Sequence, residues 1–65
     1  MRSHVFKTTV YRDGDVHMRF TTLEGHQGYK SAWSFSRPGD RIETRRMVFE
    51  DNRLIKDEVC INETV

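Results

Sequence analysis

Residues that could hold a metal or act as nucleophiles are few in this chain and stand far apart. Its nitrogen and sulfur ligands are His4, His17, His26 and Cys60. None of them pairs at the short spacing that structural zinc sites use, and no serine or cysteine stands in the local pattern of a known nucleophile. We therefore expect no metal site, no cofactor and no catalytic residue, and we predict that the protein is not an enzyme.

A segment with two glycines, Gly25 to Gly28, is the stretch best suited to approach a phosphate group through its backbone. It matches neither the P-loop nor the dinucleotide-binding fingerprint, and no helix is expected to open from it. The sequence predicts instead that this segment forms the tip of a hairpin.

Charged side chains offer a second kind of chemistry, the binding of an anionic partner. In the strand register derived below, Arg19, Lys30 and Lys56 lie on the same face of a sheet. Like charges on neighbouring strands repel each other and favour an anion between them. We assign this mixed basic and aromatic face as the binding surface, with the candidate residues Arg19, Lys30, Arg45, Lys56, His17 and Phe49.

Four turn signals divide the chain and predict five strands. Asp13-Gly14 is a strong hairpin dipeptide, and Asp51-Asn52 is a weaker one of the same kind. Pro38-Gly39 suits the centre of a type II turn, and the segment from Leu23 to Gly28 supplies the remaining connection. This pattern is typical of an antiparallel meander and of an all-β fold.

A two-residue loop at each turn gives every strand pair a register that burial can test. A slip of one residue would move the apolar set of a strand to the other face, so agreement across the four turns supports five strands. The residues that then gather on the core face are Val5, Thr9, Tyr11, Val16, Met18, Phe20, Tyr29, Trp33, Phe35, Ile42, Thr44, Val48, Ile55, Val59 and Ile61.

A row of polar residues crosses this core face in the same register. Arg46 and Asp57 are expected directly opposite each other on neighbouring strands, and Ser31 lies in the same row. Such an ion pair is favourable when exposed and costly when it is buried without further hydrogen bonds. We interpret the row as a structural device near a barrel mouth or a dimer edge.

The segment 40–50 has an alternative interpretation as a helix. Asp40 and Glu43 stand at the spacing of a capping box, which favours an α+β fold with a helix near 40–50. Against the helix, the positions one turn after Ile42 are Arg45 and Arg46, so no apolar stripe forms. We therefore prefer a strand.

Length and composition limit what these elements can build. The 65 residues, of which 35% are hydrophobic and 32% charged, suffice for a single small β domain over residues 1–65. A lone sheet must cover its apolar face, so we expect an SH3-like or half-open barrel, or a sheet that pairs into a dimeric sandwich. No apolar run is long enough for a signal peptide or a membrane span, and we expect a cytoplasmic protein without membrane contact.

Two functions fit these observations. In the first, a small regulator or inhibitor docks on a protein partner through the basic and aromatic face, and self-association is compatible with it. In the second, a small-barrel regulator binds single-stranded DNA or RNA, with Tyr29, Phe49 or Phe6 as stacking platforms. The net charge of +1 lacks the strong positive field of a typical DNA-binding domain, so we prefer the first.

Overall fold

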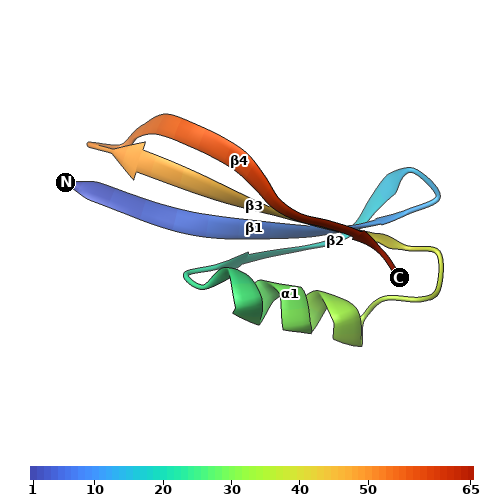
Figure 1. Ribbon diagram of the computed structural model, residues 1–65. Coiled ribbons are helices and arrows are strands. Elements are labelled where there is room, and N and C mark those ends of the chain that lie inside the picture. The colour runs from blue at the N-terminus through green and yellow to red at the C-terminus, as the bar shows by residue number, and fades with distance from the viewer.

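The computed structural model describes all residues, 1–65, and consists of one antiparallel sheet and one helix (Figure 1). About 63% of the residues lie in strands, which confirms the expected all-β class. The elements in chain order are β1 (Arg2–Arg12), β2 (Asp15–Thr22), α1 (Gly25–Ser34), β3 (Arg41–Glu50) and β4 (Arg53–Thr64). The four strands lie in the order β2-β1-β3-β4, so two hairpins meet along β1 and β3. The predicted meander is therefore wrong in its strand order, because β3, which follows α1, pairs with β1 and not with β2.

Both hairpin turns lie where the sequence predicts them. Asp13 and Gly14 join β1 to β2 with φ angles of 53° and 82°. Asp51 and Asn52 join β3 to β4 with φ angles of 48° and 66°. Aspartate, asparagine and glycine tolerate this left-handed region better than other residues, which explains why these dipeptides mark the turns.

The number of strands differs from the prediction, because residues expected to form the third strand belong to α1. The segment from Tyr29 to Phe35 has the alternating pattern that is typical of a strand, with Tyr29, Ser31, Trp33 and Phe35 at every second position. The two glycines before it are typical of a turn. In the structure, however, α1 begins at Gly25, and the Pro38-Gly39 turn joins this helix to β3 rather than one strand to another.

Small residues on α1 allow the helix to lie close against the sheet. A Cβ atom at Gly28 would lie 2.8 Å from Thr8 Oγ1 and 3.1 Å from Thr22 Oγ1. Ala32, one turn further along the helix, is fully buried. The glycine that suggested a hairpin tip is therefore required by close packing of helix and sheet.

The alternative helix near 40–50 is wrong, because this segment forms β3, a central strand of the sheet. Its pairing with both β1 and β4 satisfies the backbone on each side. Its successive side chains point to opposite faces, so Arg45 and Arg46 do not share an environment.

Three β-bulges change the register that simple hairpins would produce. One falls between Val10 and Tyr11 in the pairing of β1 with β2, and two interrupt the pairing of β3 with β4. Each bulge shifts the partner strand by one residue and exchanges the faces of the residues beyond it. The single core face expected from the sequence is therefore divided between the two sides of the sheet.

The side of the sheet that α1 covers, the inner face, holds the hydrophobic core. Val10, Ala32 and Ile42 form its centre, and each is fully buried. Thr8 and Thr44 are also fully buried, and their hydroxyl groups form a hydrogen bond of 2.8 Å. The helix thus supplies the cover that we expected from barrel closure or from a second copy.

An ion pair between Arg12 and Asp40 holds the segment between α1 and β3 against β1. The Arg12 guanidinium donates two hydrogen bonds, of 3.1 and 2.9 Å, to the carboxylate of Asp40, whose side chain is only 4% exposed. The backbone N–H of Arg37 donates a third, of 2.9 Å. These donors stabilise the charged carboxylate, and Arg12 in particular lowers the pKa of Asp40 to about 2.

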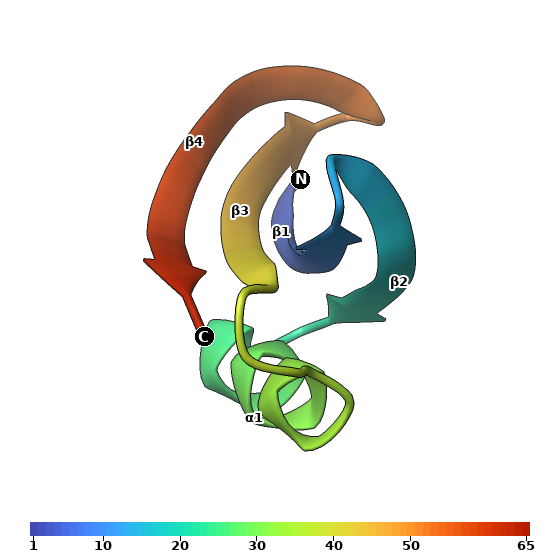
Figure 2. The ribbon, with the colours of Figure 1, turned by 90° about the vertical axis from the view of Figure 1, so that its right-hand side faces the viewer.

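The molecule is elongated, because the sheet extends beyond the helix. Its dimensions are 40 × 20 × 15 Å, and the tip of the β3–β4 hairpin projects beside the N-terminus (Figure 1). Viewed along the strands, the sheet is strongly twisted and curls away from α1 (Figure 2). No helix is both long enough and apolar enough to cross a membrane.

Candidate functional site

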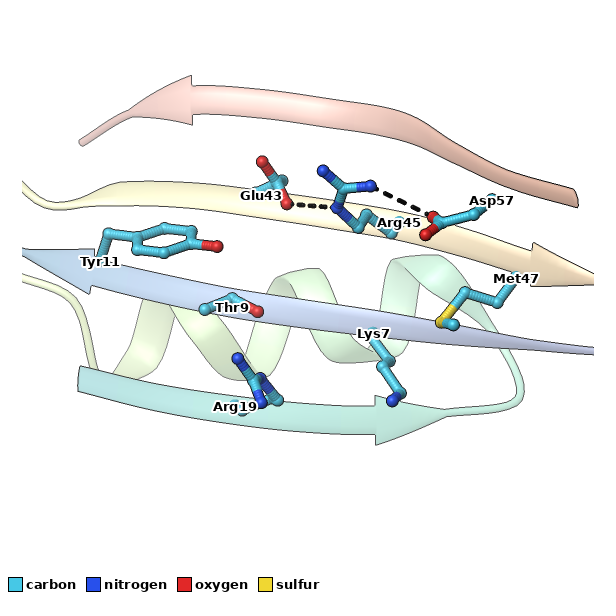
Figure 3. Close-up of a pocket in the computed structure, with 8 residues that line it drawn as sticks. All are labelled: Lys7, Thr9, Tyr11, Arg19, Glu43, Arg45, Met47 and Asp57. Atoms are coloured by element: carbon cyan, nitrogen blue, oxygen red, sulfur yellow. Dashed lines mark hydrogen bonds and ion pairs between the residues drawn. The ribbon is translucent and has the colours of Figure 1, made fainter. Parts of the chain in front are cut away.

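The side of the sheet opposite α1, the outer face, has no element packed on it (Figure 2). A hollow of about 250 Å³ lies on this face. Its lining comes from all four strands (Figure 3) and consists of Lys7, Thr9, Tyr11, Arg19, Glu43, Arg45, Met47 and Asp57. It is the hollow to which all four strands contribute, and we take it as the candidate site.

On the β3 and β4 side of the hollow, charged groups neutralise one another. Arg45 Nε donates a hydrogen bond of 2.7 Å to Glu43, and Arg45 Nη1 donates one of 3.3 Å to Asp57. Arg41 adds a second contact to Glu43, of 3.3 Å, and lies 4.1 Å from the centre of the Tyr11 ring. The hydrogen bond from Arg45 lowers the pKa of Glu43, so this carboxylate stays ionised at neutral pH.

On the β1 and β2 side, by contrast, two cations lack an acidic partner. Neither Lys7 nor Arg19 takes part in any ion pair of the structure. In the pairing of β1 with β2, Lys7 faces Thr21 and Arg19 faces Thr9, and in the pairing of β1 with β3, Lys7 faces a third cation, Arg45. Lys7 and Arg19 are diagonal neighbours on adjacent strands and project from the same face (Figure 3). The hollow therefore carries an excess of positive charge at one side.

Apolar side chains continue the outer face toward the tip of the β3–β4 hairpin. Val5 pairs with Met47, and Phe49 pairs with Leu54, so these four residues extend from the hollow along β1, β3 and β4. Leu54 is 46% exposed. The site thus combines unpaired cations with an accessible apolar strip.

The structure brings together three of the six residues predicted for binding. Arg19, Arg45 and Phe49 lie on the outer face. Lys56 pairs with the inner-face residue Val48 and lies 3.6 Å from Glu58, whereas Lys30 belongs to the exposed side of α1. The remaining residue, His17, is the extra residue of the bulge in β2.

The predicted polar row does not exist as a row, because the bulge at the start of β4 shifts Asp57 by one residue and because Ser31 lies on α1. Arg46 pairs with Glu58 at 3.2 Å rather than with Asp57, which instead contacts Arg45 on the other face. Ser31 lies on α1 and donates a hydrogen bond of 3.1 Å to the backbone oxygen of Gln27. The expected pairing of Arg46 with Asp57 is therefore wrong by one residue of register.

Sequence reasoning missed Lys7, the second unpaired cation. Lys7 and Thr9 alternate along β1, and Arg19 and Thr21 alternate along β2 in the same way. Two hairpin strands with basic and threonine residues at alternate positions would have indicated a shared polar face. The signal was present, but the expected register lacked the bulge next to Tyr11 and therefore put Lys7 and Arg19 on opposite faces of the sheet.

The other features of the surface give less support to a site. A hollow of about 310 Å³ lies at the β3–β4 tip, but its acidic residues Glu50 and Asp51 already pair with Arg2 and with the N-terminal amine. No group of three His, Cys, Asp or Glu residues is placed to hold a metal ion. Comparison with protein-family models, with curated proteins and with solved structures finds no match.

Proposed function

We propose that this protein is a non-catalytic binding module that docks on a partner protein through its outer face. The observation that carries this proposal is the pair of cations, Lys7 and Arg19, which lack an acidic partner in a hollow that no other element covers. Their positive charge, which no acidic side chain of the protein neutralises, is available to an acidic group of a partner.

The neighbouring apolar strip offers the buried area that the cations lack. Charged groups chiefly set orientation and the rate of association, whereas buried apolar area and well-packed anchors set most of the affinity. Met47 is a diagonal neighbour of Lys7 on the same face, and Phe49 lies two residues further along β3. Charge and apolar area side by side are the combination that a protein partner requires.

Charge reversal on this face tests the proposal. The double variant Lys7→Glu, Arg19→Glu is compared with the wild type in quantitative affinity capture from the native source, with chemical crosslinking to locate the contact. Lys30→Glu is the matched control, because it reverses one exposed cation on α1, away from the outer face. We expect the double variant to lose the captured partner and the control to retain it; equal capture by all three proteins would refute the proposal.

The alternative function, binding of single-stranded nucleic acid, draws on the same cations. Its proposed stacking platforms, however, are dispersed: the Phe6 ring packs under Gly25 on the inner face, and Tyr29 donates a hydrogen bond to Glu63. Only Phe49 lies on the outer face. Titration of labelled DNA and RNA strands at two salt concentrations tests this alternative, since phosphate contacts give a steep dependence of affinity on salt.

A further inference from the structure

Two features of the outer face restrict the kind of partner, provided that the proposed docking function holds. One is the distribution of charge within the hollow, and the other is its concave shape. We infer that the outer face binds an acidic amphipathic helix of the partner, which places a carboxylate between Lys7 and Arg19 and an apolar side chain against Met47.

The charge distribution selects a carboxylate at one position rather than a continuous anionic chain. Across the hollow from Lys7 and Arg19 stand the carboxylates of Glu43 and Asp57, both held in place by Arg45. A phosphate backbone following the hollow would meet these acids as well as the cations. A single acidic side chain directed to the β1 and β2 side meets only the cations, and a charge-assisted contact of this kind is among the stronger hydrogen bonds.

The shape of the hollow selects a convex occupant. The sheet curls around the outer face (Figure 2), and two copies of such a surface placed face to face would leave a void between them. A flat sheet from a partner meets the same difficulty. A helix is a convex cylinder of about 10 Å diameter with its side chains, so it can follow a curled sheet while one row of side chains enters the hollow.

The spacing of residues along the strands sets the spacing required on the helix. Lys7 and Val5 are two residues apart on β1, and Val5 pairs directly with Met47. Two residues of a strand advance by about 6.6 Å, and four residues of a helix advance by about 6 Å. An acidic residue at position i and an aliphatic residue at i+3 or i+4 would therefore contact the cations and Met47 together.

An unbiased selection tests this inference without knowledge of the natural partner. A library of random residues on the exposed side of a fixed helical scaffold is selected for binding to the immobilised wild-type protein. We expect enrichment of Asp or Glu at one position with Leu, Ile or Met three or four positions later. The affinity of these binders should fall at least tenfold for Arg19→Glu and remain unchanged for Lys30→Glu.

A second library of unstructured peptides separates this inference from the function on which it rests. Binders from the unstructured library that require Lys7 and Arg19, with none from the helical library, would overturn the helical ligand and leave the docking face intact. If neither library gives a binder that depends on these cations, both proposals fail. Helical binders that lack an acidic residue would also overturn the inference.

Discussion

Two polar side chains in the core, Thr8 and Thr44, satisfy each other by a hydrogen bond. Both residues are fully buried, and their hydroxyl groups bond to each other at 2.8 Å. A buried hydroxyl that loses its partner costs about 1–3 kcal/mol, whereas removal of both polar groups can be nearly neutral.

Replacement of this pair by valine therefore predicts a non-additive result. Thr8→Val and Thr44→Val should each lower the free energy of unfolding by about 1–3 kcal/mol, since each leaves one hydroxyl without a partner. The double variant should recover most of this loss. Urea denaturation of the four proteins gives the coupling energy, and a double variant that shows the plain sum of the two losses would contradict the assignment.

The carboxylate of Asp40 predicts a pH dependence of stability. Its pKa is about 2 in the folded protein, against 3.8 for an unperturbed aspartate. A group whose pKa is lowered by folding stabilises the folded state above its unfolded pKa and loses this contribution as the pH falls toward its folded pKa. The stabilisation from Asp40 should thus be complete above pH 4 and disappear as the pH falls from about 4 to 2.

Asp40→Asn provides the measurement for this prediction. The variant loses the ionic contact with Arg12, so its thermal midpoint should be lower than that of the wild type at pH 7, and the two should converge as the pH approaches 2. Asp15→Asn is a suitable control, because Asp15 is exposed and takes part in no ion pair. A difference between Asp40→Asn and wild type that is independent of pH would contradict the assigned role.

At the scale of elements, the helix depends on a close approach that only glycine allows. Gly28→Ala would place a Cβ atom 2.8 Å from Thr8 Oγ1. Overpacking of this kind costs about 1–3 kcal/mol, which exceeds the gain in helix propensity of up to about 1 kcal/mol. We therefore expect a net loss of stability in thermal or urea denaturation.

Ser34→Ala supplies the matched control for this substitution. It introduces alanine on the exposed side of the same helix, where the side chain meets no close contact, so the gain in helix propensity is expected without overpacking. The variant also loses one weak hydrogen bond of 3.3 Å from the Ser34 hydroxyl to the backbone oxygen of Lys30. Its stability should equal or slightly exceed that of the wild type. If Gly28→Ala proved as stable as Ser34→Ala, helix and sheet would not be in the close contact described above.

These elements also show what the sequence could and could not predict. Asp13-Gly14 and Asp51-Asn52 identified both hairpins because their positive φ angles depend on local chemistry. The helix was missed because its glycines are required by close contacts with residues distant in the chain, such as Thr8, and these contacts cannot be read from the local sequence. The bulges were missed for a similar reason, since a change of register after a correct turn leaves no local signal.

The missed helix and bulges also explain which site residues were predicted correctly. Arg19 and Arg45 were placed on one face correctly. Lys30 was assigned to that face only because α1 was taken for a strand. Lys56 was assigned to it because the bulge at the start of β4 could not be foreseen, and that bulge turns its side chain to the inner face.

For the molecule as a whole, the short helix and long sheet predict uneven stability. The helix covers the sheet only as far as Phe6, which packs under Gly25, and the distal parts of β1, β3 and β4 extend beyond it (Figure 1). The ion pairs at this end, Met1 with Asp51 and Arg2 with Glu50, are largely exposed. Exposed pairs contribute little, so this end should open without unfolding of the core.

Hydrogen exchange within the single strand β3 tests this prediction with an internal control. Amides of the distal part, Met47 to Glu50, should exchange at least about tenfold faster than those of Ile42 to Thr44, which lie beneath the helix. Both groups lie in a strand paired on both sides, so a difference reflects the cover that α1 provides. Equal protection along β3 would instead mean that the protein opens as one cooperative unit, and that the apolar strip from Val5 to Phe49 is presented to a partner as a rigid surface.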